Sequence, residues 1–206
     1  KDGVDSSSVE GLGESSPYAI PGWTADVHHP RVGVPVLWWR SVGHTHTAYV
    51  VETMMDELAQ AAGADPVEFR LRYLADPRAR GVLEMAADKA GALPEGLTRG
   101  IAVHKSFGSY VAEVADVRMR EDGKVKVVRV TCAVDCGVPI NPSNIRAQIE
   151  GGLGYGLSAI LREEITLTEG EVDQSNFYDY TPLRITDMPE VEVHILPSTQ
   201  APTGIG

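Results

Sequence analysis

The chain has 206 residues, of which 43% are hydrophobic and 23% charged, and its formal net charge at pH 7 is −11. This composition is typical of a folded protein, and the length suffices for one sizeable core or two small ones. The acidic balance argues against nucleic acid or an anionic membrane surface as partner, and no run of about 18 apolar residues predicts a membrane span.

Residues 1–36 contain four Pro and five Gly and show no helical period. Such a segment is typical of an extended arm that lies over other structure. A helical region covering residues 37–100 is expected to follow it.

Within that region the sequence predicts three helices. The first carries an apolar stripe at helical spacing and a glycine suited to end it, namely Val51, Met55, Leu58, Ala62 and Gly63. The second is expected to be capped by Asp65, with a proline at the first helical position and Glu68 completing a capping box. Asp76, again followed by proline, starts a third helix that runs towards Gly91. The stretch "GALPEGLTRG" is expected to be a loop.

In residues 101–206 the hydrophobic period changes to two, and we expect hairpins and a glycine-rich helix. The stretches "GSYVAEVADVRM" and "KVKVVRVTCAVD" flank Asp122-Gly123, which is a strong hairpin-turn signal. Asn141 caps the helix "PSNIRAQIEGGLGYGLSAIL", a second hairpin turns within "LTEGEV" at residues 169–170, and "EVEVHIL" is a last strand. Helices placed early and antiparallel hairpins placed later predict an α+β fold rather than a doubly wound parallel sheet.

The two cysteines, Cys132 and Cys136, lie on one predicted strand. At about 3.3 Å per residue they would be roughly 13 Å apart, beyond the reach of a disulfide. Their spacing is not the usual zinc pair either. We interpret them as small, partly buried side chains rather than metal or redox ligands.

Several histidines and acids also invite a functional interpretation, namely His28, His29, His44, His46, Glu52 and Asp56. A zinc site would need an acid–histidine framework at metal-ligand spacing, and none surrounds these histidines. Surface or interface histidines are the simpler interpretation. The two acids lie one helical turn apart, and a solvated helix face accounts for them.

Four glycines interrupt the last predicted helix, at Gly151, Gly152, Gly154 and Gly156. Each would destabilise an exposed helix by about 0.5–1 kcal/mol, so something must compensate. Their spacing is not that of a dinucleotide-binding loop. Two explanations remain open, namely close packing of another helix and close approach of a flat ligand.

The stretch "VLWWRSVGHTH" places two adjacent tryptophans and an arginine at a glycine-containing turn before a helix. Aromatic bulk beside a guanidinium is the chemistry of a pocket for a flat or anionic group. A structural tryptophan corner is the alternative.

Three long stretches carry a resemblance to a known family: "WWRSVGHTHTAYVVETMMDELAQAAGADPVEFRLRYL", "AVDCGVPINPSNIRAQIEGGLGYGLSAIL" and "MPEVEVHILPSTQAPTGIG". Together with "SSVEGL" and "PYAIPGW", they resemble the molybdenum-binding subunit of the xanthine oxidase and aldehyde oxidase family, most nearly its isoquinoline 1-oxidoreductase beta subgroup. The resemblance runs collinearly over nearly the whole chain. It implies that residues 1–206 are part of a molybdopterin-binding domain.

The resemblance also implies roles for individual residues. Those matching the family's cofactor contacts are Arg40, Ser41, Gly43, Gln148, Thr203, Gly204, Ile205 and Gly206. Trp39 and Val42 match positions that line the approach of the substrate. The glycines after Gln148 would let the helix lie close to the flat pterin. Family members continue the last loop with a glutamate that acts as general base, and that residue is expected directly after Gly206.

The implied activity is hydroxylation of N-heteroaromatic compounds or aldehydes with water as the oxygen source. The implied cofactor is the molybdenum cofactor, as molybdopterin or its cytosine dinucleotide form. Electrons would pass to a separate 2Fe-2S subunit, since two cysteines cannot supply the four ligands of such a cluster. Further pterin-contacting loops would come from the rest of the molybdenum subunit, so we expect this chain alone to hold no cofactor and to be inactive.

Two rival hypotheses remain beside this one. The first is a non-catalytic α+β module that uses the tryptophan loop to bind another protein, and the second is a histidine-based zinc enzyme.

Overall fold

The computed structural model describes residues 5–34 and 39–205 and has an α+β fold, as predicted. Its α-helices are α1 (His44–Ala61), α2 (Pro66–Tyr73), α3 (Pro77–Ala90) and α4 (Pro142–Leu161). Three short 3-10 helices are η1 (Ser6–Val9), η2 (Gly13–Ser15) and η3 (Ile185–Asp187). The strands are β1 (Thr98–Ser106), β2 (Ser109–Met119), β3 (Val125–Asp135), β4 (Leu167–Thr168), β5 (Glu171–Val172) and β6 (Glu190–Ile195).

The main sheet has the strand order β1-β2-β3-β6, and β4 and β5 form a separate two-stranded ribbon. The predicted hairpin at Asp122-Gly123 joins β2 to β3, with Gly123 at a φ of 76°. The predicted second hairpin joins β4 to β5. Strand β6 pairs parallel to β3 instead of joining a hairpin. A parallel neighbour needs a long crossover, and the chain from α4 to η3 supplies it.

Strand β1 lies partly where a loop was expected, since it begins at Thr98. Its first three residues include Gly100, which weakens the strand signal in the sequence. The strand forms because its full length pairs with β2, from Thr98 opposite Val117 to Ser106 opposite Ser109. Residues from Thr98 onward therefore form a strand because of their pairing with β2 and not because of their own sequence pattern.

The helix starts follow the local rules. The carboxylate of Asp65 accepts hydrogen bonds from the N–H groups of Val67 and Glu68 at 2.9 and 3.0 Å, and α2 begins at the next residue. The carboxylate of Asp76 likewise accepts from the N–H of Arg78 at 2.9 Å at the start of α3. Both of these predicted N-caps are confirmed, and so is the third, because Asn141 Oδ1 accepts from the N–H of Asn144 at 3.1 Å at the start of α4.

The predicted apolar stripe of α1 is correct only in its first half. Val51 and Met55 are buried, but Leu58 is 43% exposed and Ala62 lies outside the core. Ala59 takes the next inward position, so the buried face follows a spacing of four residues.

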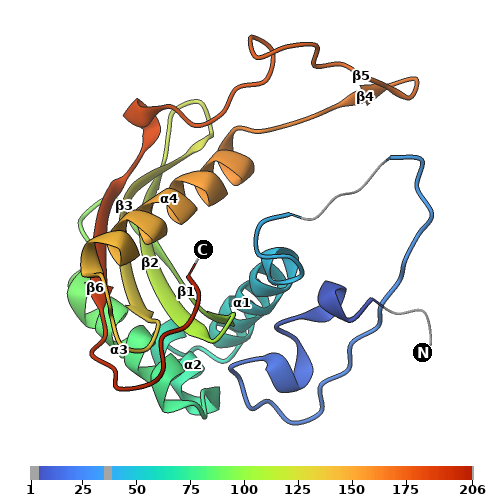
Figure 1. The fold of residues 1–206 in the computed structure, drawn as a ribbon. Coiled ribbons are helices and arrows are strands. Elements are labelled where there is room, and N and C mark those ends of the chain that lie inside the picture. The colour runs from blue at the N-terminus through green and yellow to red at the C-terminus, as the bar shows by residue number, and fades with distance from the viewer. Residues whose placement is uncertain (1–4, 35–38, 206) are drawn as a thin grey trace.

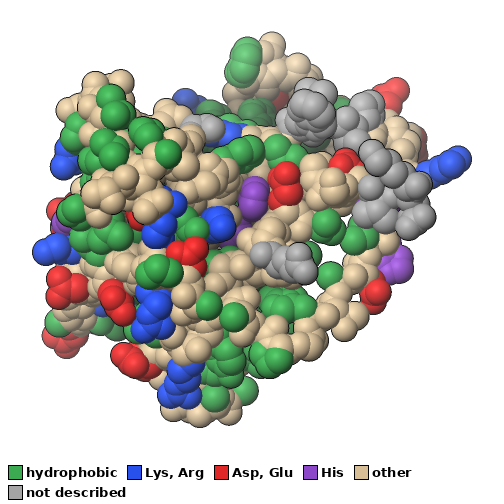
Figure 2. Space-filling model, turned by 60° about the horizontal axis from the view of Figure 1, so that its bottom comes forward, with side chains coloured by type: hydrophobic (Ala, Val, Ile, Leu, Met, Phe, Trp, Pro, Cys, Tyr) green, Lys and Arg blue, Asp and Glu red, His purple; other side chains and the backbone are tan. Residues whose placement is uncertain are grey.

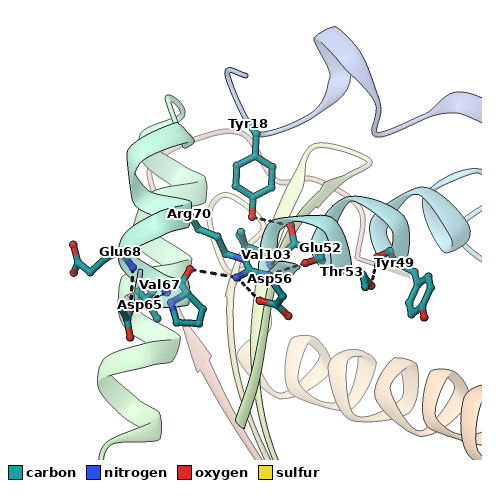
Figure 3. Close-up of polar contacts among 11 residues, drawn as sticks. Tyr18, Tyr49, Glu52, Thr53, Asp56, Asp65, Val67, Glu68, Arg70 and Val103 are labelled. Atoms are coloured by element: carbon teal, nitrogen blue, oxygen red, sulfur yellow. Dashed lines mark hydrogen bonds and ion pairs between the residues drawn. The ribbon is translucent and has the colours of Figure 1, made fainter. Parts of the chain in front are cut away.

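The interpretation of Glu52 as part of a solvated face is wrong. Its side chain is buried between α1, α2 and β1, and Figure 3 shows three groups converging on it. Arg70 Nε donates to the carboxylate at 2.9 Å, Tyr18 Oη at 2.7 Å and the N–H of Val103 at 3.1 Å. Asp56, one turn on, binds the same guanidinium at 2.7 Å from a half-exposed position.

The two faces of the sheet are covered differently. Helix α3 packs on one face, where Val82, Leu83 and Ala86 join Val103 and Val114 in the main core. On the other face α4 crosses the strands, as Figure 1 shows, and a smaller cluster forms under it from Cys132, Val134, Cys136, Ile145 and Ile149. This second face is only partly filled, which leaves room for the cavity described below.

The arm at the start of the chain is fixed to the body near α2. Tyr18 is buried and forms a bridge with Leu74, and the N–H of Ala19 donates to Tyr73 O at 2.8 Å. On the face shown in Figure 2, acidic and basic side chains are interspersed. Within residues 5–34 and 39–205, none of the helices has the length and apolar character that a membrane span requires.

Candidate functional site

A cavity of about 350 Å³ lies between the start of α1, helix α4, strands β1 and β2, and the last loop of the chain. Six residues expected to contact the cofactor or the substrate line it, from three distant segments: Trp39, Arg40, Ser41, Gln148, Gly204 and Ile205. Thr203 lines an adjoining cavity, to which Gln148 and Ile205 also contribute. Val42 and Gly43 line neither of these cavities. Trp38 and Gly206 lie outside the described residues.

The turn before α1 has an unusual backbone. Ser41 and Val42 adopt φ angles of 72° and 49°, a conformation that costs about 1–3 kcal/mol per non-glycine residue. The turn is held by the N–H of Val42 donating to Trp39 O at 3.0 Å and by Thr45 Oγ1 donating to Arg40 O at 2.8 Å. Strain of this kind is concentrated at ligand-binding sites.

Gly43 has a packing role in the same turn. A Cβ at this position would lie 1.9 Å from Ser7 O of the arm, so no larger residue fits. The requirement for glycine here comes from the contact with the arm.

Aromatic and cationic groups form the rim of the cavity. The rings of Trp39 and Tyr155 lie 5.5 Å apart, and the guanidinium of Arg40 lies 5.6 Å from the centre of the Tyr155 ring. Arg40 is the only Lys or Arg among the described residues that line the cavity, and it has no ion-pair partner among them. An exposed guanidinium stacked on a tyrosine is suited to binding an anionic or flat group.

The glycines of α4 leave one surface of the helix open. Gly152 and Gly156 line the cavity; a Cβ at Gly156 would meet nothing within 4 Å, and at Gly152 only Arg40 Nη2 at 3.9 Å. Gly151 is also open, and Gly154 faces the sulfur of Met188 at 3.4 Å. Packing of another helix therefore does not explain these glycines among the described residues.

The last loop is tied to the sheet by several hydrogen bonds. The N–H of Thr203 donates to Cys136 O at 2.9 Å. Ser109 Oγ lies 2.7 Å from Thr203 Oγ1 and donates to Gly204 O at 2.7 Å. Ile205 packs against the apolar cluster under α4. The loop is thereby fixed at the edge of the cavity.

Asp135 supports this loop from the end of β3. Arg78 donates to its two carboxylate oxygens at 2.7 Å each, and the N–H of Gly137 donates at 2.9 Å. Burial opposes the charge on Asp135, but these hydrogen bonds outweigh it and lower the pKa of the carboxyl group. Gly137 has a φ of 76°, and a Cβ there would lie 2.1 Å from Ala201 O, so this turn requires glycine.

The floor of the cavity comes from alternate residues of β1 and β2. Ser109, Val111 and Glu113 point into it from β2, and His104 points into it from β1. Sequence reasoning missed these residues. The signal was present in "GSYVAEVADV", where a glutamate occupies an inward position of an alternating strand.

Two histidines close the side of the cavity nearest the arm. His44 Nδ1 lies 2.8 Å from His104 Nε2, and burial lowers the pKa of His104 to about 4. Burial also lowers the pKa of His44, so the pair is neutral near pH 7. His44 was expected to be a surface or interface residue, but its side chain is largely buried.

Metal ligation by protein side chains has no support here. Across residues 5–34 and 39–205, no three His, Cys, Asp or Glu side chains are grouped so as to hold a metal ion. His28 and His29 are exposed, and His46 Nε2 lies 2.8 Å from Ser8 O. Both cysteines are free, and they are more deeply buried than the partial burial that was predicted.

A concave, mostly apolar cavity with a few convergent polar groups defines a domain that binds a small molecule. The sequence matches two family models, each of a molybdopterin cofactor-binding domain, over residues 46–189 and 9–74. The chain therefore belongs to the molybdopterin cofactor-binding domains of the xanthine oxidase family, and the resemblance noted from the sequence is confirmed.

Individual relatives cover nearly all of this chain. The beta chain of isoquinoline 1-oxidoreductase from Brevundimonas diminuta is 32% identical over 202 residues, which are 94% of this chain and 26% of that protein. One of the subunits of nicotinate dehydrogenase from Pseudomonas putida is 33% identical over 205 residues, with coverages of 86% and 17%. The chain thus spans about a quarter or less of the length of these relatives.

Solved structures align over a smaller part. Quinoline 2-oxidoreductase from Pseudomonas putida 86 aligns with a TM-score of 0.41 at 24% identity, over 43% of this chain and 12% of that chain.

Proposed function

We propose that this chain forms one wall of the cofactor site of a molybdenum-dependent oxidoreductase. The complete enzyme hydroxylates N-heteroaromatic compounds or aldehydes with water and passes the electrons to a 2Fe-2S subunit. One observation carries the proposal: residues 39–41, the inward-facing residues of α4 from Gln148 to Gly156, and residues 204–205 lie far apart in sequence and line one cavity. The named relatives act on isoquinoline and nicotinate, which are N-heteroaromatic compounds.

The residues of the cavity fit a flat, anionic cofactor. The glycine surface of α4 is open where a Cβ would fill the space, and Arg40 supplies a positive charge at the rim. The amide of Gln148 has no hydrogen-bond partner among the described residues and lines both cavities. The open surface of α4 can lie against the flat pterin ring, the Gln148 amide can hydrogen-bond to it, and Arg40 can pair with its phosphate.

The residues that would hold the molybdenum cofactor are Arg40, Ser41, Gln148, Gly152, Gly156, Thr203, Gly204 and Ile205, together with Gly206. When bound, the cofactor supplies the redox centre that accepts two electrons from the substrate. We propose molybdopterin or its cytosine dinucleotide form.

This chain's own contribution is binding and positioning. Trp39 and Tyr155 shield the rim from water and confine a flat substrate. The hydrogen bonds of Ser109 fix the last loop, so a general base carried directly after Gly206 would start from a fixed position. Such positioning is how a protein raises the effective concentration of a reacting group.

The partners we propose are a 2Fe-2S subunit and the rest of the molybdenum subunit. The segment between α4 and β6 exposes large apolar side chains, including Phe177 at 87%, Tyr178 at 78% and Ile185 at 91%. Figure 1 shows that this segment extends away from the sheet. Exposed apolar groups gathered on one segment favour contact with further protein.

The test uses the complete protein that contains this chain, expressed with its iron–sulfur partner. We expect stoichiometric molybdenum and hydroxylation of isoquinoline, nicotinate or an aldehyde. Gln148→Ala should lower the molybdenum content several-fold, whereas Glu150→Ala, an exposed position two residues along α4, should leave it unchanged. Absence of molybdenum from the complete protein would contradict the proposal, and so would equal molybdenum contents in the two variants.

The 206-residue chain alone is expected to contain no stoichiometric molybdenum and to have no hydroxylase activity, since it holds only one wall of the site. Metal analysis and an activity assay of the isolated chain test this expectation.

A further inference from the structure

We propose that Glu113 is a recognition residue of the cavity and that its carboxylate binds the N–H edge of a flat heterocycle. The inference rests on the proposed function, because it assigns a specific contact to the molecule that occupies the same cavity. None of the residues matched to the family through the resemblance is Glu113.

The position of Glu113 places its carboxylate on the cavity floor. It lies in the middle of β2, opposite Ala102 of β1 and Cys132 of β3. Its neighbours on β2, Ala112 and Val114, point to the opposite face and belong to the main core. Because side chains alternate along a strand, the Glu113 side chain points to the face that carries the cavity, and it lines that cavity.

The carboxylate of Glu113 has no partner among the residues that the structure describes. Within residues 5–34 and 39–205 it makes no hydrogen bond and no ion pair, although it is half-buried. Burial raises the pKa of this carboxyl group, with no opposing hydrogen bond. A half-buried acid that no protein group partners, with a perturbed pKa, is typical of a functional site in a cavity.

The surroundings of Glu113 offer it no cation at the floor. His104 and His44 are neutral near pH 7, and the neighbouring Cys132 thiol stays protonated because burial raises its pKa. Arg40 is at the rim, beside Tyr155. No cation among the described residues is therefore placed to pair with this carboxylate, and we assign that role to a ligand of the cavity.

The chemistry of the site indicates which ligand group this is. A carboxylate accepts two parallel hydrogen bonds, so it matches a ring N–H with an adjacent N–H donor. The glycine surface of α4 and the rings of Trp39 and Tyr155 leave space for a flat ring system. Two sources share this chemistry, namely the pterin of the cofactor and the N–H form of an N-heteroaromatic substrate or product.

The experiment measures binding of three probes by isothermal titration calorimetry to the complete protein that contains this chain, prepared with its iron–sulfur partner and without cofactor. Pterin (2-amino-4-oxopteridine) has adjacent N–H donors, quinolin-2-one has a single ring N–H, and quinoline has the same shape with no N–H at neutral pH. Replacing Glu113 by Gln removes one acceptor and places a donor against the ligand. We expect Glu113→Gln to weaken binding of at least one N–H probe by about ten-fold or more, and to change quinoline binding by less than about two-fold.

Two further variants serve as controls. Glu113→Asp keeps the charge and should bind the N–H probe more tightly than Glu113→Gln does. Glu150→Gln removes an exposed acid outside the cavity and should bind like the unsubstituted chain. Circular dichroism and urea unfolding check that each variant is folded.

Each result has a defined meaning. A selective loss of pterin affinity assigns Glu113 to the cofactor, and a selective loss of quinolin-2-one affinity assigns it to the substrate or product. Equal affinities of Glu113→Gln and the unsubstituted complete protein for both N–H probes overturn the inference, and so does failure of the folded complete protein to bind either one. The molybdenum content of the complete protein, compared between Gln148→Ala and Glu150→Ala, tests the proposed function separately.

Discussion

Glu52 and Glu113 are both at least partly withdrawn from solvent, and their surroundings are opposite. Glu52 is 7% exposed, and its carboxylate accepts hydrogen bonds from Arg70, Tyr18 and the N–H of Val103. Glu113 opens to a cavity and has no partner among the described residues. The Glu52 carboxylate links α1, α2 and the edge of β1, whereas the Glu113 carboxylate links no elements among the described residues.

The contrast separates a structural acid from a binding acid. A saturated carboxylate has no capacity left for a ligand, and removing its cation leaves a buried charge uncompensated. An unsaturated one costs stability in the empty chain and recovers it when a donor arrives. Burial and the adjacent carboxylate raise the pKa of Tyr18, which therefore stays a hydrogen-bond donor to Glu52 throughout the physiological range.

Replacing Arg70 by Met should have the largest effect on stability. The guanidinium is fully buried, and its loss leaves Glu52 charged and without a cation. We expect the free energy of unfolding in urea to fall by about 3–5 kcal/mol. Arg72→Met, at an exposed position of the same helix, should change it by less than about 0.5 kcal/mol. Similar losses in both variants would show that the Glu52 cluster is not a structural centre.

Replacing Glu52 by Gln should cost somewhat less, about 2–3 kcal/mol. The amide keeps one acceptor for Tyr18 or Arg70, and Arg70 keeps its ion pair with Asp56 at 2.7 Å. Denaturant unfolding measures the change. A loss below about 0.5 kcal/mol would remove the distinction between the two glutamates, because the saturated acid would then be dispensable.

Asp116 is a third buried acid and extends the comparison to pH. It is 1% exposed and pairs with Arg99 and Arg129 at 2.7 Å each. Burial opposes its charge, but the two guanidinium groups outweigh burial and lower its pKa. Its contribution is therefore present above the unfolded-state pKa, near about 3.9, and is lost as the pH falls through the lower folded-state value.

The substitution Asp116→Asn tests whether the contribution of Asp116 to stability is lost as the pH falls. We expect a loss of about 1–3 kcal/mol at pH 7, and the difference from the unsubstituted chain should shrink as the pH falls below about 4. Urea unfolding at several pH values measures it. A difference that does not change with pH would contradict the ion-pair account.

The sequence alone predicted those features that depend on neighbouring residues. Asp65 and Asp76 cap their helices through hydrogen bonds two or three residues away, and Asp122-Gly123 turns a hairpin. The burial of Glu52 was missed because its partner Arg70 lies on another helix. The parallel pairing of β6 with β3 was also not predicted, because the position of β6 depends on a long crossover and not on its neighbours in sequence.

The candidate site also has features that the sequence could predict and features that it could not. The residues expected to bind the cofactor came from a family resemblance, and the local pattern of the chain contains no sign that Trp39, Gln148 and Gly204 line one cavity. Glu113 was missed although its strand was predicted. Alternation assigns a residue to a face, but only the packed structure shows that this part of the face is left open.

Replacing Glu113 by Gln should have the smallest effect on stability. Whether the substitution lowers or raises the free energy of unfolding should depend on pH. Burial raises the pKa of Glu113, so the folded chain holds its proton to a higher pH than the unfolded chain does. Stability is then highest below the unfolded-state pKa, near about 4.3, and falls as the pH rises through the folded-state value. The variant lacks this fall and should be as stable as the unsubstituted chain, or more stable, at pH 8.

The comparison at pH 4 and pH 8 is made as the difference between the two chains at each pH, because a neighbour also titrates in this range. Burial lowers the pKa of His104 to about 4, so this histidine is partly protonated at the acid end, whereas the Cys132 thiol stays protonated because burial raises its pKa. Urea unfolding of the two chains at both pH values gives the result. A loss of more than about 1 kcal/mol at pH 8 would mean that the carboxylate has a partner within the protein, and Glu113 would then be a structural acid like Glu52.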